Sequence, residues 1–254
     1  MTEPVVPVAP HPPLSGYYQS PAERSTFVRQ LFDRTARHYD GINLFFCFGS
    51  GNWYRRRALR RAGLRPGQRV LDIATGTGLL ARQALALAGE AADVTGIDIS
   101  ESMLAVARHN LDIPLIQGRA EQLPIEGDSV DFLCMGYGLR HVPDLMPTFA
   151  EFYRVLRPSG TVLLLEMSKP RAQWYRDFVS LYLGRIVPYL CGRLTARADA
   201  RLLMEYYWET IEHCVSPKVI SEALAKTGFE AIGCQEDLDL FRAYVGRKPR
   251  DKRS

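Results

Sequence analysis

The sequence predicts an α/β fold with a doubly wound, mostly parallel sheet of seven strands. Three observations support this. Short apolar runs alternate with helix-periodic segments between residues 70 and 165. A glycine-rich turn follows the first of these runs. After Pro170 the alternation gives way to a helical stretch and then to two closing strands. The chain has 254 residues, 46% of them hydrophobic, which is enough for one large α/β domain.

The elements are predicted in order from the apolar spacing. Periodic apolar residues predict two helices before the sheet, over Glu23–Tyr39 and Trp53–Ala62. The seven strands are expected at Val70–Ala74, Val94–Ile97, Pro114–Gln117, Val130–Met135, Thr161–Leu165, Glu230–Cys234 and Phe241–Val245. The remaining helices are expected at Leu79–Leu87, Glu101–Asn110, Met146–Leu156 and Pro217–Thr227, with a helical insertion over residues 171–215.

The N-terminal residues 1–20 are rich in proline and are predicted to be a disordered arm. Residues 21–254 are expected to form a single domain that begins with the helices of residues 21–64. No basic segment precedes an apolar core at the N-terminus, and no apolar run approaches the roughly 18 residues that cross a bilayer. The five cysteines are scattered, so neither a metal site nor a disulfide framework is expected, and the sequence predicts a cytoplasmic protein.

The turn after the first predicted strand, Asp72 to Gly78, is the strongest local sign of a ligand site. Its glycines let the backbone approach a ligand closely. Gly76-x-Gly78-x-x-Ala81, with Asp98 further on, also satisfies the dinucleotide fingerprint, so an NAD-dependent oxidoreductase is an alternative. However, the carboxylate of Asp72 beside the turn suits the ammonium group of a methionine moiety better than a pyrophosphate.

A second motif distinguishes these alternatives. The segment Glu151–Gly160 leads into an apolar strand and resembles the R-V-L-x-P-G-G segment of class I methyltransferases. The order of motifs resembles that Rossmann-like superfamily over roughly residues 65–170, which implies S-adenosyl-L-methionine as the cofactor. The resemblance implies that Asp98 accepts the ribose hydroxyls. It also implies that the turn residues Asp72, Gly76, Thr77 and Gly78 face the methionine and ribose, and that Gln117–Glu121, with Arg119 and Ala120, lies near the adenine. Asp98 could instead be a helix N-terminal acid, although Ser100 suits that cap better.

Motifs outside this core indicate a narrower family. They are Phe32-Asp33-x-x-Ala36-x-x-Tyr39-Asp40-x-x-Asn43, Phe48-Gly49-Ser50-Gly51, Trp53-x-Arg55-Arg56, Tyr137-Gly138-Leu139-Arg140-His141-Val142-x-Asp144 and Leu165-Glu166-Met167-Ser168-Lys169-Pro170. Together they resemble the ubiquinone/menaquinone C-methyltransferase family of the UbiE type. This resemblance implies methyl transfer to a ring carbon of a polyprenylated phenol or quinol. Tyr39 and Asp40 are interpreted as part of an N-terminal lid over the cofactor, or as helix-end packing.

The sequence departs from the family pattern mainly on the acceptor side. His141 stands where the family usually has Asn, and Arg119 and Gly136, both candidate cofactor-binding residues, replace an Asn and a Ser. Tyr206–His213 occupies the place of a Ser-Ile-x-x-Phe-Pro segment, and Asp239-Leu240-Phe241 replaces a Gly-Gly pair. Other small molecules or phospholipid headgroups therefore remain alternative acceptors, and a non-catalytic cofactor-binding module remains an alternative function.

Arg140 and His141 are the candidate catalytic residues because they follow the fourth strand at the ligand-binding edge of the sheet. Arg140 is expected to hold an acceptor oxyanion, and His141 is expected to take a proton near neutral pH. The alternatives are a salt bridge from Arg140 to Asp144 or Glu166, and a solvated or capping role for His141.

The expected partner is a lipophilic aromatic acceptor covered by the helical insertion. The aromatic residues of the insertion either line an acceptor pocket or form plain core: Trp174, Tyr175, Phe178, Tyr182 and Tyr189. The basic runs Arg55–Arg61 and Arg247–Arg253 are either solvated or approach anionic lipid at a membrane surface. A homodimer is implied by the family resemblance alone. The mild net charge of +4 and the lack of interleaved stacking aromatics argue against nucleic acid.

Overall fold

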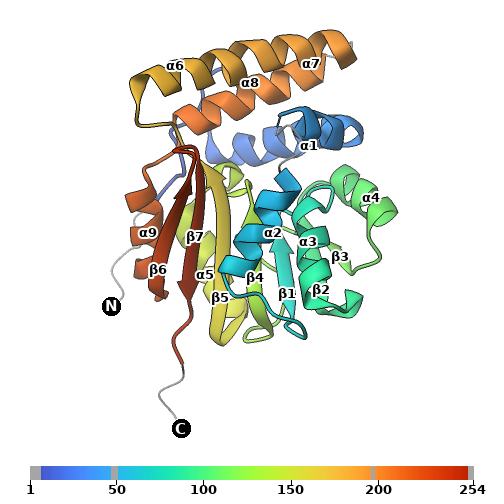
Figure 1. Cartoon of the computed structure of the whole chain (residues 1–254), viewed down its shortest axis with the longest axis vertical. Helices are drawn as coiled ribbons and strands as arrows, with labels where there is room; N and C mark the ends of the chain where they lie inside the picture. The colour runs from blue at the N-terminus through green and yellow to red at the C-terminus, as the bar shows by residue number, and fades with distance from the viewer. Residues whose placement is uncertain (1–6, 47–50, 196–197, 251–254) are drawn as a thin grey trace.

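The computed structural model describes residues 7–46, 51–195 and 198–250, and one seven-stranded sheet lies at its centre (Figure 1). The strand order is β3-β2-β1-β4-β5-β7-β6. The strands are β1 (Val70–Ile73), β2 (Val94–Asp98), β3 (Leu115–Gln117), β4 (Val130–Gly136), β5 (Leu156–Met167), β6 (Glu230–Asp237) and β7 (Phe241–Arg247). β1 to β5 are parallel, whereas β7 runs antiparallel to both β5 and β6. The predicted doubly wound, mostly parallel fold is confirmed.

Helices cover both faces of this sheet. On one face, α5 (Leu145–Val155) and α9 (Pro217–Lys226) bury Phe149 and Leu224 in a core with β-strand residues such as Leu133. On the other face, α2 (Gly51–Arg61) and α3 (Leu79–Ala88) form a separate core with the strands. All four residues of β1 are buried, as expected for a parallel strand covered on both sides.

A third layer of helices lies across the carboxyl edge of the sheet (Figure 1). It consists of α1 (Pro21–Phe46), α6 (Gln173–Leu181), α7 (Val187–Thr195) and α8 (Ala198–Glu212), and a π-helical turn, η3 (Tyr182–Ile186), joins α6 to α7. Leu31, Val187 and Leu203 belong to its own hydrophobic core. α4 (Glu101–Asn110) contacts α1 from the side. None of the helices in the described residues is long and apolar enough to span a bilayer.

The arm predicted to be disordered is instead packed against the domain over residues 7–20. The backbone of Val8 bonds to the Asp144 carboxylate and to the Leu145 amide, and the Pro10 carbonyl accepts from the Val215 amide. Proline has no amide hydrogen, but its carbonyl still accepts, and this allows a proline-rich segment to pair with other elements. Residues 1–6 lie outside the described residues, as do the motif residues 47–50 and the tail residues 251–254.

β1 and β4 are adjacent, and the chain crosses to opposite sides of the sheet after them, which makes their carboxyl ends the topological switch point. Two residues just beyond these ends, Ala74 and Tyr137, have positive φ values of 52° and 61°. The turns approach each other so closely that a Cβ added at Gly138 would lie 2.7 Å from the Cβ of Ala74. The two turns therefore form the base of a ligand site.

Candidate active site

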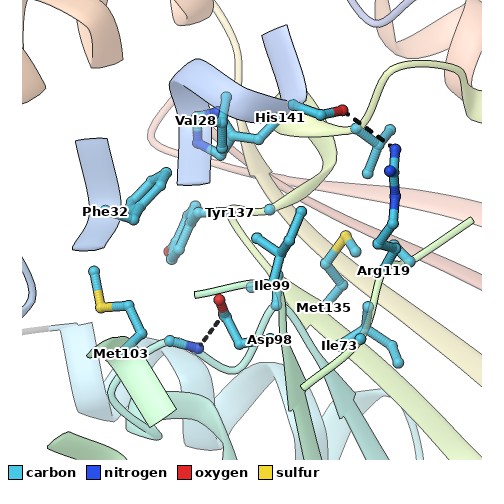
Figure 2. A pocket seen from close by; sticks show the side chains of 18 of the residues that line it. Val28, Phe32, Ile73, Asp98, Ile99, Met103, Arg119, Met135, Tyr137 and His141 are labelled. Carbon is cyan, nitrogen blue, oxygen red and sulfur yellow. Dashed lines mark hydrogen bonds between the residues drawn. The ribbon is translucent and has the colours of Figure 1, made fainter. Parts of the chain in front are cut away.

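A cavity of about 770 Å³, partly open to solvent, lies at this switch point. Figure 2 shows its wall, with Val28 and Phe32 of α1 on one side and Ile73, Asp98 and Ile99 of the sheet edge on the other. Residues at or just beyond the carboxyl ends of the first four strands contribute to the wall, including Gly76, Asp98, Arg119, Ala120, Gly136 and His141. The structure therefore brings together most of the residues that the sequence indicated as candidates.

Asp98 is the buried carboxylate of this cavity. One oxygen accepts from the Gly76 amide at 2.8 Å, drawn as a dashed line in Figure 2, and the other accepts from the Ser100 amide at 2.8 Å. Burial raises the pKa of Asp98 to about 6, against the opposing effect of these two hydrogen bonds. Each oxygen keeps a further lone pair, so the ionised group can accept from two hydroxyls of a ligand. The cap of α4 is Ser100, whose side chain accepts from the Met103 amide.

Asp72 lies beneath the cavity and not in its wall. Its carboxylate accepts from the Thr75 hydroxyl at 2.7 Å and from the Cys134 thiol at 3.5 Å. Burial raises the pKa of Asp72 to about 7. Gly78, with a φ of 85°, is the N-cap residue of α3 and also lies outside the wall. These residues hold the shape of the glycine-rich turn.

The helix α1 is fastened over the cavity by two aspartates. Asp33 accepts from the Ser100 hydroxyl at 2.6 Å, and Asp40 accepts from the hydroxyl of Thr77. These bonds tie α1 to the turns that follow β2 and β1. Tyr39 lies in the cavity wall, as a lid residue should, and Arg119 on the far side reaches the Ser25 hydroxyl of α1 at 3.4 Å (Figure 2).

The guanidinium of Arg140 is fully buried and does not line the cavity. Its Nε donates to Glu166 at 2.7 Å, and one Nη donates to the Thr210 hydroxyl at 2.8 Å. Of the interpretations offered by the sequence, the structure shows the ion pair with Glu166. The expected direct contact with an acceptor oxyanion is not supported, because the Glu166 carboxylate already binds the cation.

His141 lies in the cavity wall with its ring among Phe32, Tyr206 and Tyr207, at centroid distances of 5.3, 5.5 and 5.7 Å. Its Nδ1 is 3.3 Å from the Tyr206 hydroxyl, and its buried Nε2 has no hydrogen-bond partner among the described residues. Burial, and then the charge of Arg140, hold the pKa of His141 well below its usual value. The imidazole is therefore neutral near pH 7, and one of its nitrogens is available to a ligand.

A smaller cavity of about 410 Å³ adjoins the first one. Its wall is mainly apolar, with Ile42, Met167, Leu203, Met204 and Phe241, and its polar members are Asn43 and three tyrosines, Tyr39, Tyr137 and Tyr207. The same three tyrosines also line the first cavity, so they form the boundary between the two.

Two expectations hold for only some of their residues. Tyr175 and Tyr182 pack against the core of the helical layer, as one interpretation predicts. Trp174, Phe178 and Tyr189 line neither cavity and are 75%, 58% and 55% exposed, because the faces of α6 and α7 that bear them point away from the domain.

In the basic run, Arg56, Arg60 and Arg61 are exposed, as on a solvated helix face. Arg55 is instead buried, with its guanidinium carbon 5.6 Å from the Tyr137 ring centre.

Several contributing residues were not singled out from the sequence. Tyr207 lies in a segment noted only for its departure from the family pattern, although its regular spacing from Leu203 indicates the same helix face. His11 and Arg24 both contact the backbone carbonyl of Arg140 behind the site. No local pattern connects residues so far apart in the chain.

The fold and this site define a class I methyltransferase that uses S-adenosylmethionine. Solved structures agree on the fold. A possible histamine N-methyltransferase from Thermotoga maritima aligns with a TM-score of 0.62 at 19% identity, covering 87% of this chain and 99% of the other. A Haemonchus contortus phosphoethanolamine N-methyltransferase bound to S-adenosyl-L-methionine aligns with a TM-score of 0.61 at 22% identity, covering 87% and 60%.

Sequence comparison then identifies the family. The sequence model of the ubiE/COQ5 methyltransferase family matches residues 20–238, and the chain belongs to this family. It is 33% identical to the ubiquinone/menaquinone biosynthesis C-methyltransferase UbiE of Shewanella piezotolerans, over 85% of this chain and 88% of the relative. It is 32% identical to the demethylmenaquinone methyltransferase of Bacillus cereus, over 92% of this chain and 99% of the relative. The NAD-dependent alternative is therefore wrong.

Proposed function

We propose that the chain methylates a ring carbon of a quinol that carries an isoprenoid chain. The observation that carries this proposal is the shared tyrosine boundary between the cavity that contains Asp98 and a mainly apolar one. An isoprenoid quinol in the apolar cavity would have its ring at Tyr39, Tyr137 and Tyr207, next to the cofactor. The names of the relatives from Shewanella piezotolerans and Bacillus cereus support an acceptor of this class.

The larger cavity offers groups that suit S-adenosylmethionine, because its wall combines the buried carboxylate of Asp98 with apolar side chains such as Ile99 and Met103. We assign the ribose hydroxyls to Asp98, and the adenine to the apolar wall around Ile99 and Met103. Further contacts are assigned to Tyr39, Gly76, Arg119, Ala120 and Gly136, while Asp72, Thr77 and Gly78 act by holding the turn. When bound, this cofactor supplies an electrophilic methyl group.

The acceptor ring becomes nucleophilic when one of its hydroxyls loses a proton. We assign this proton to Nε2 of His141, in the tautomer whose Nδ1–H donates to the Tyr206 oxygen. The methylated ring is then a neutral keto tautomer, and it becomes aromatic again when the proton on the methylated carbon is lost and the ring oxygen is reprotonated. The net release is the single proton that His141 took up, and His141 passes it to solvent. Arg140 is assigned a positioning role, because its ion pair with Glu166 fixes the turn that carries His141.

The test is a methyl-transfer assay with labelled S-adenosylmethionine and a para-dihydroxynaphthalene that carries a short isoprenyl chain. We expect one methyl group on a ring carbon, identified by mass and by its stability to ether cleavage. The oxidised quinone is the matched control and should not react, because its ring is electron-poor. Label on oxygen, or label only in phospholipid headgroups of an added lipid extract, would contradict the proposal.

We also propose that this enzyme is cytoplasmic and touches the membrane surface through α6 and α7. Trp174, Phe178, Leu181 and Tyr189 form an exposed apolar stripe, and Arg185 is exposed among them. Aromatic residues suit the headgroup boundary, and arginine suits anionic lipid. Wild-type protein should co-sediment with phosphatidylglycerol vesicles at low salt, and W174S/F178S should not. If sedimentation instead shows a homodimer that W174S/F178S dissociates, this face binds a second copy and not lipid.

A further inference from the structure

Tyr207 of α8 occupies the boundary between the two cavities. Its side chain lines both, and its hydroxyl is 2.8 Å from the hydroxyl of Tyr39, which also lines both. The two phenols approach each other from different layers of the fold, since Tyr39 belongs to α1 and Tyr207 to α8. An acceptor ring that reaches the cofactor cavity from the apolar cavity must pass this pair.

The ring of Tyr207 is held in place by its neighbours. The Arg140 guanidinium carbon is 5.3 Å from the ring centre, and the Phe32 and His141 rings contact it edge-on at 6.4 and 5.7 Å. Arg140 also donates to the Tyr207 carbonyl at 3.3 Å. These contacts hold the ring of Tyr207 in place, and its hydroxyl is the part of the side chain that can bond to a ligand.

This hydroxyl remains protonated near neutral pH. Burial raises the pKa of Tyr207 well above its usual value, while the charge of Arg140 opposes that rise. A neutral phenol donates one hydrogen bond. The nearby cation polarises the ring without taking part in the bond.

No charged side chain lines the apolar cavity among the described residues, and Arg140 lines neither cavity. The polar groups that an acceptor oxygen meets on its way toward the cofactor are therefore uncharged: Asn43 and the hydroxyls of Tyr39, Tyr137 and Tyr207. Of these, Tyr39 and Tyr207 are the pair whose hydroxyls are hydrogen-bonded to each other. Given the proposed function, we infer that the Tyr207 hydroxyl donates a hydrogen bond to the ring oxygen of the acceptor, and that this oxygen replaces Tyr39 as its partner. Tyr207 is thus an acceptor-contacting residue that stabilises the developing phenolate, and Arg140 acts through it.

The first experiment compares Tyr207→Phe with wild type. Removing one donor from an oxyanion site costs roughly a hundredfold in turnover, so kcat should fall by about that factor while the Kd for S-adenosylmethionine is unchanged. Tyr39→Phe should lower kcat much less, because it removes the partner that the acceptor displaces from Tyr207. Any loss of its assigned cofactor contact is measured separately, as the Kd for S-adenosylmethionine. Tyr153→Phe is the matched control, since Tyr153 lies on α5 and packs against Phe229, on a face away from both cavities.

The second experiment does not need turnover. A nitronaphthol bound in the presence of S-adenosylhomocysteine reports its own ionisation by colour. Wild type and Tyr153→Phe should ionise it at a pH at least one unit lower than Tyr207→Phe does, about a tenfold difference in the ionisation constant. Equal ionisation in wild type and Tyr207→Phe, or a loss of turnover below threefold, would overturn the inference. If wild type shows the colour shift but methylates no quinol, the proposed function fails and the donor site stands.

Discussion

The two sides of this site are built from different parts of the chain. On the cofactor side, Gly76 and Asp98 lie at or just beyond the ends of the adjacent strands β1 and β2, where they are hydrogen-bonded to each other. These two residues are also close in the sequence. On the acceptor side, side chains of α1 and α8, separated by more than half the chain, meet at Tyr39 and Tyr207. A short sequence motif can therefore encode the cofactor side. The acceptor side depends on how a separate layer of helices packs on the sheet.

The largest expected effect is a loss of stability when Arg140, which joins the cofactor side to the acceptor side, is replaced. Arg140 links the turn after β4 to Glu166 of β5 and to Thr210 of α8. Arg140→Met leaves the Glu166 carboxylate buried without its partner and should lower the free energy of unfolding by about 3–5 kcal/mol. Urea unfolding measures this, and R140M/E166L should recover most of the loss because it removes both charges. A full recovery of stability without recovery of turnover would separate the structural role from the positioning role.

The next effect concerns the cofactor side alone. Asp98→Ala removes the carboxylate that is expected to accept two hydrogen bonds from the ribose hydroxyls. The Kd for S-adenosylmethionine should therefore rise by about a hundredfold or more. Titration calorimetry measures it, with the exposed Asp112→Ala as control. The Kd of a quinol analogue should change little if the two sides are as independent as their construction indicates. Unchanged cofactor affinity would remove Asp98 from the ribose site.

The same carboxylate predicts a pH dependence. Because the pKa of Asp98 is raised to about 6, the group takes up a proton as the pH falls through about 6, and it then loses its capacity to accept from two hydroxyls. The affinity for S-adenosylmethionine should weaken by up to tenfold per pH unit below that point. Calorimetry at several pH values should give a shallower profile for Asp98→Asn than for wild type. Asp72, with a pKa raised to about 7, titrates nearby, and Asp72→Asn measures its share.

The contrast between the two sides also explains what could be predicted from the sequence. The strands of the sheet were predicted because continuous apolar runs between turns identify buried parallel strands. The role of Asp98 as a ligand-site residue could be predicted because Asp98 follows the glycine-rich turn at a short, characteristic distance in the sequence. Burial of Arg140 and exposure of Trp174 could not be predicted, because both depend on which face of a helix meets another element. For the same reason the packed residues 7–20 were mistaken for a disordered arm.

The smallest expected effect lies in that N-terminal segment, where His11 supports the acceptor side from behind. His11 is 1% exposed; its Nδ1 is 2.7 Å from the Pro12 carbonyl, and its Nε2 is 2.5 Å from the Arg24 guanidinium. Arg24 in turn donates to the Arg140 carbonyl. In a neutral ring whose Nδ1–H donates to Pro12, Nε2 is unprotonated and accepts from Arg24. The Arg140 carbonyl, 3.1 Å from the same Nε2, then accepts from Arg24 and not from His11.

Burial, and then the charge of Arg24, lower the pKa of His11 to about 4. Between the ordinary histidine pKa of about 6.5 and this value, the unfolded chain binds a proton that the native state does not. The free energy of unfolding should therefore decrease as the pH falls through this window, by up to about 1.4 kcal/mol per pH unit from this group. His141, whose pKa is also lowered, acts in the same direction.

His11→Gln keeps an oxygen that can accept from Arg24 but does not titrate, so it should make the pH dependence of urea unfolding shallower by up to one proton. His109→Gln is the matched control, because His109 is exposed. If the segment positions the turn that carries His141, His11→Ala should also lower kcat on the quinol by a few-fold at unchanged cofactor Kd, and His11→Gln should restore most of it. An identical pH slope in wild type and His11→Gln would mean that His11 takes up its proton equally in the folded and unfolded chain, and it would contradict the neutral ring assigned behind Arg140.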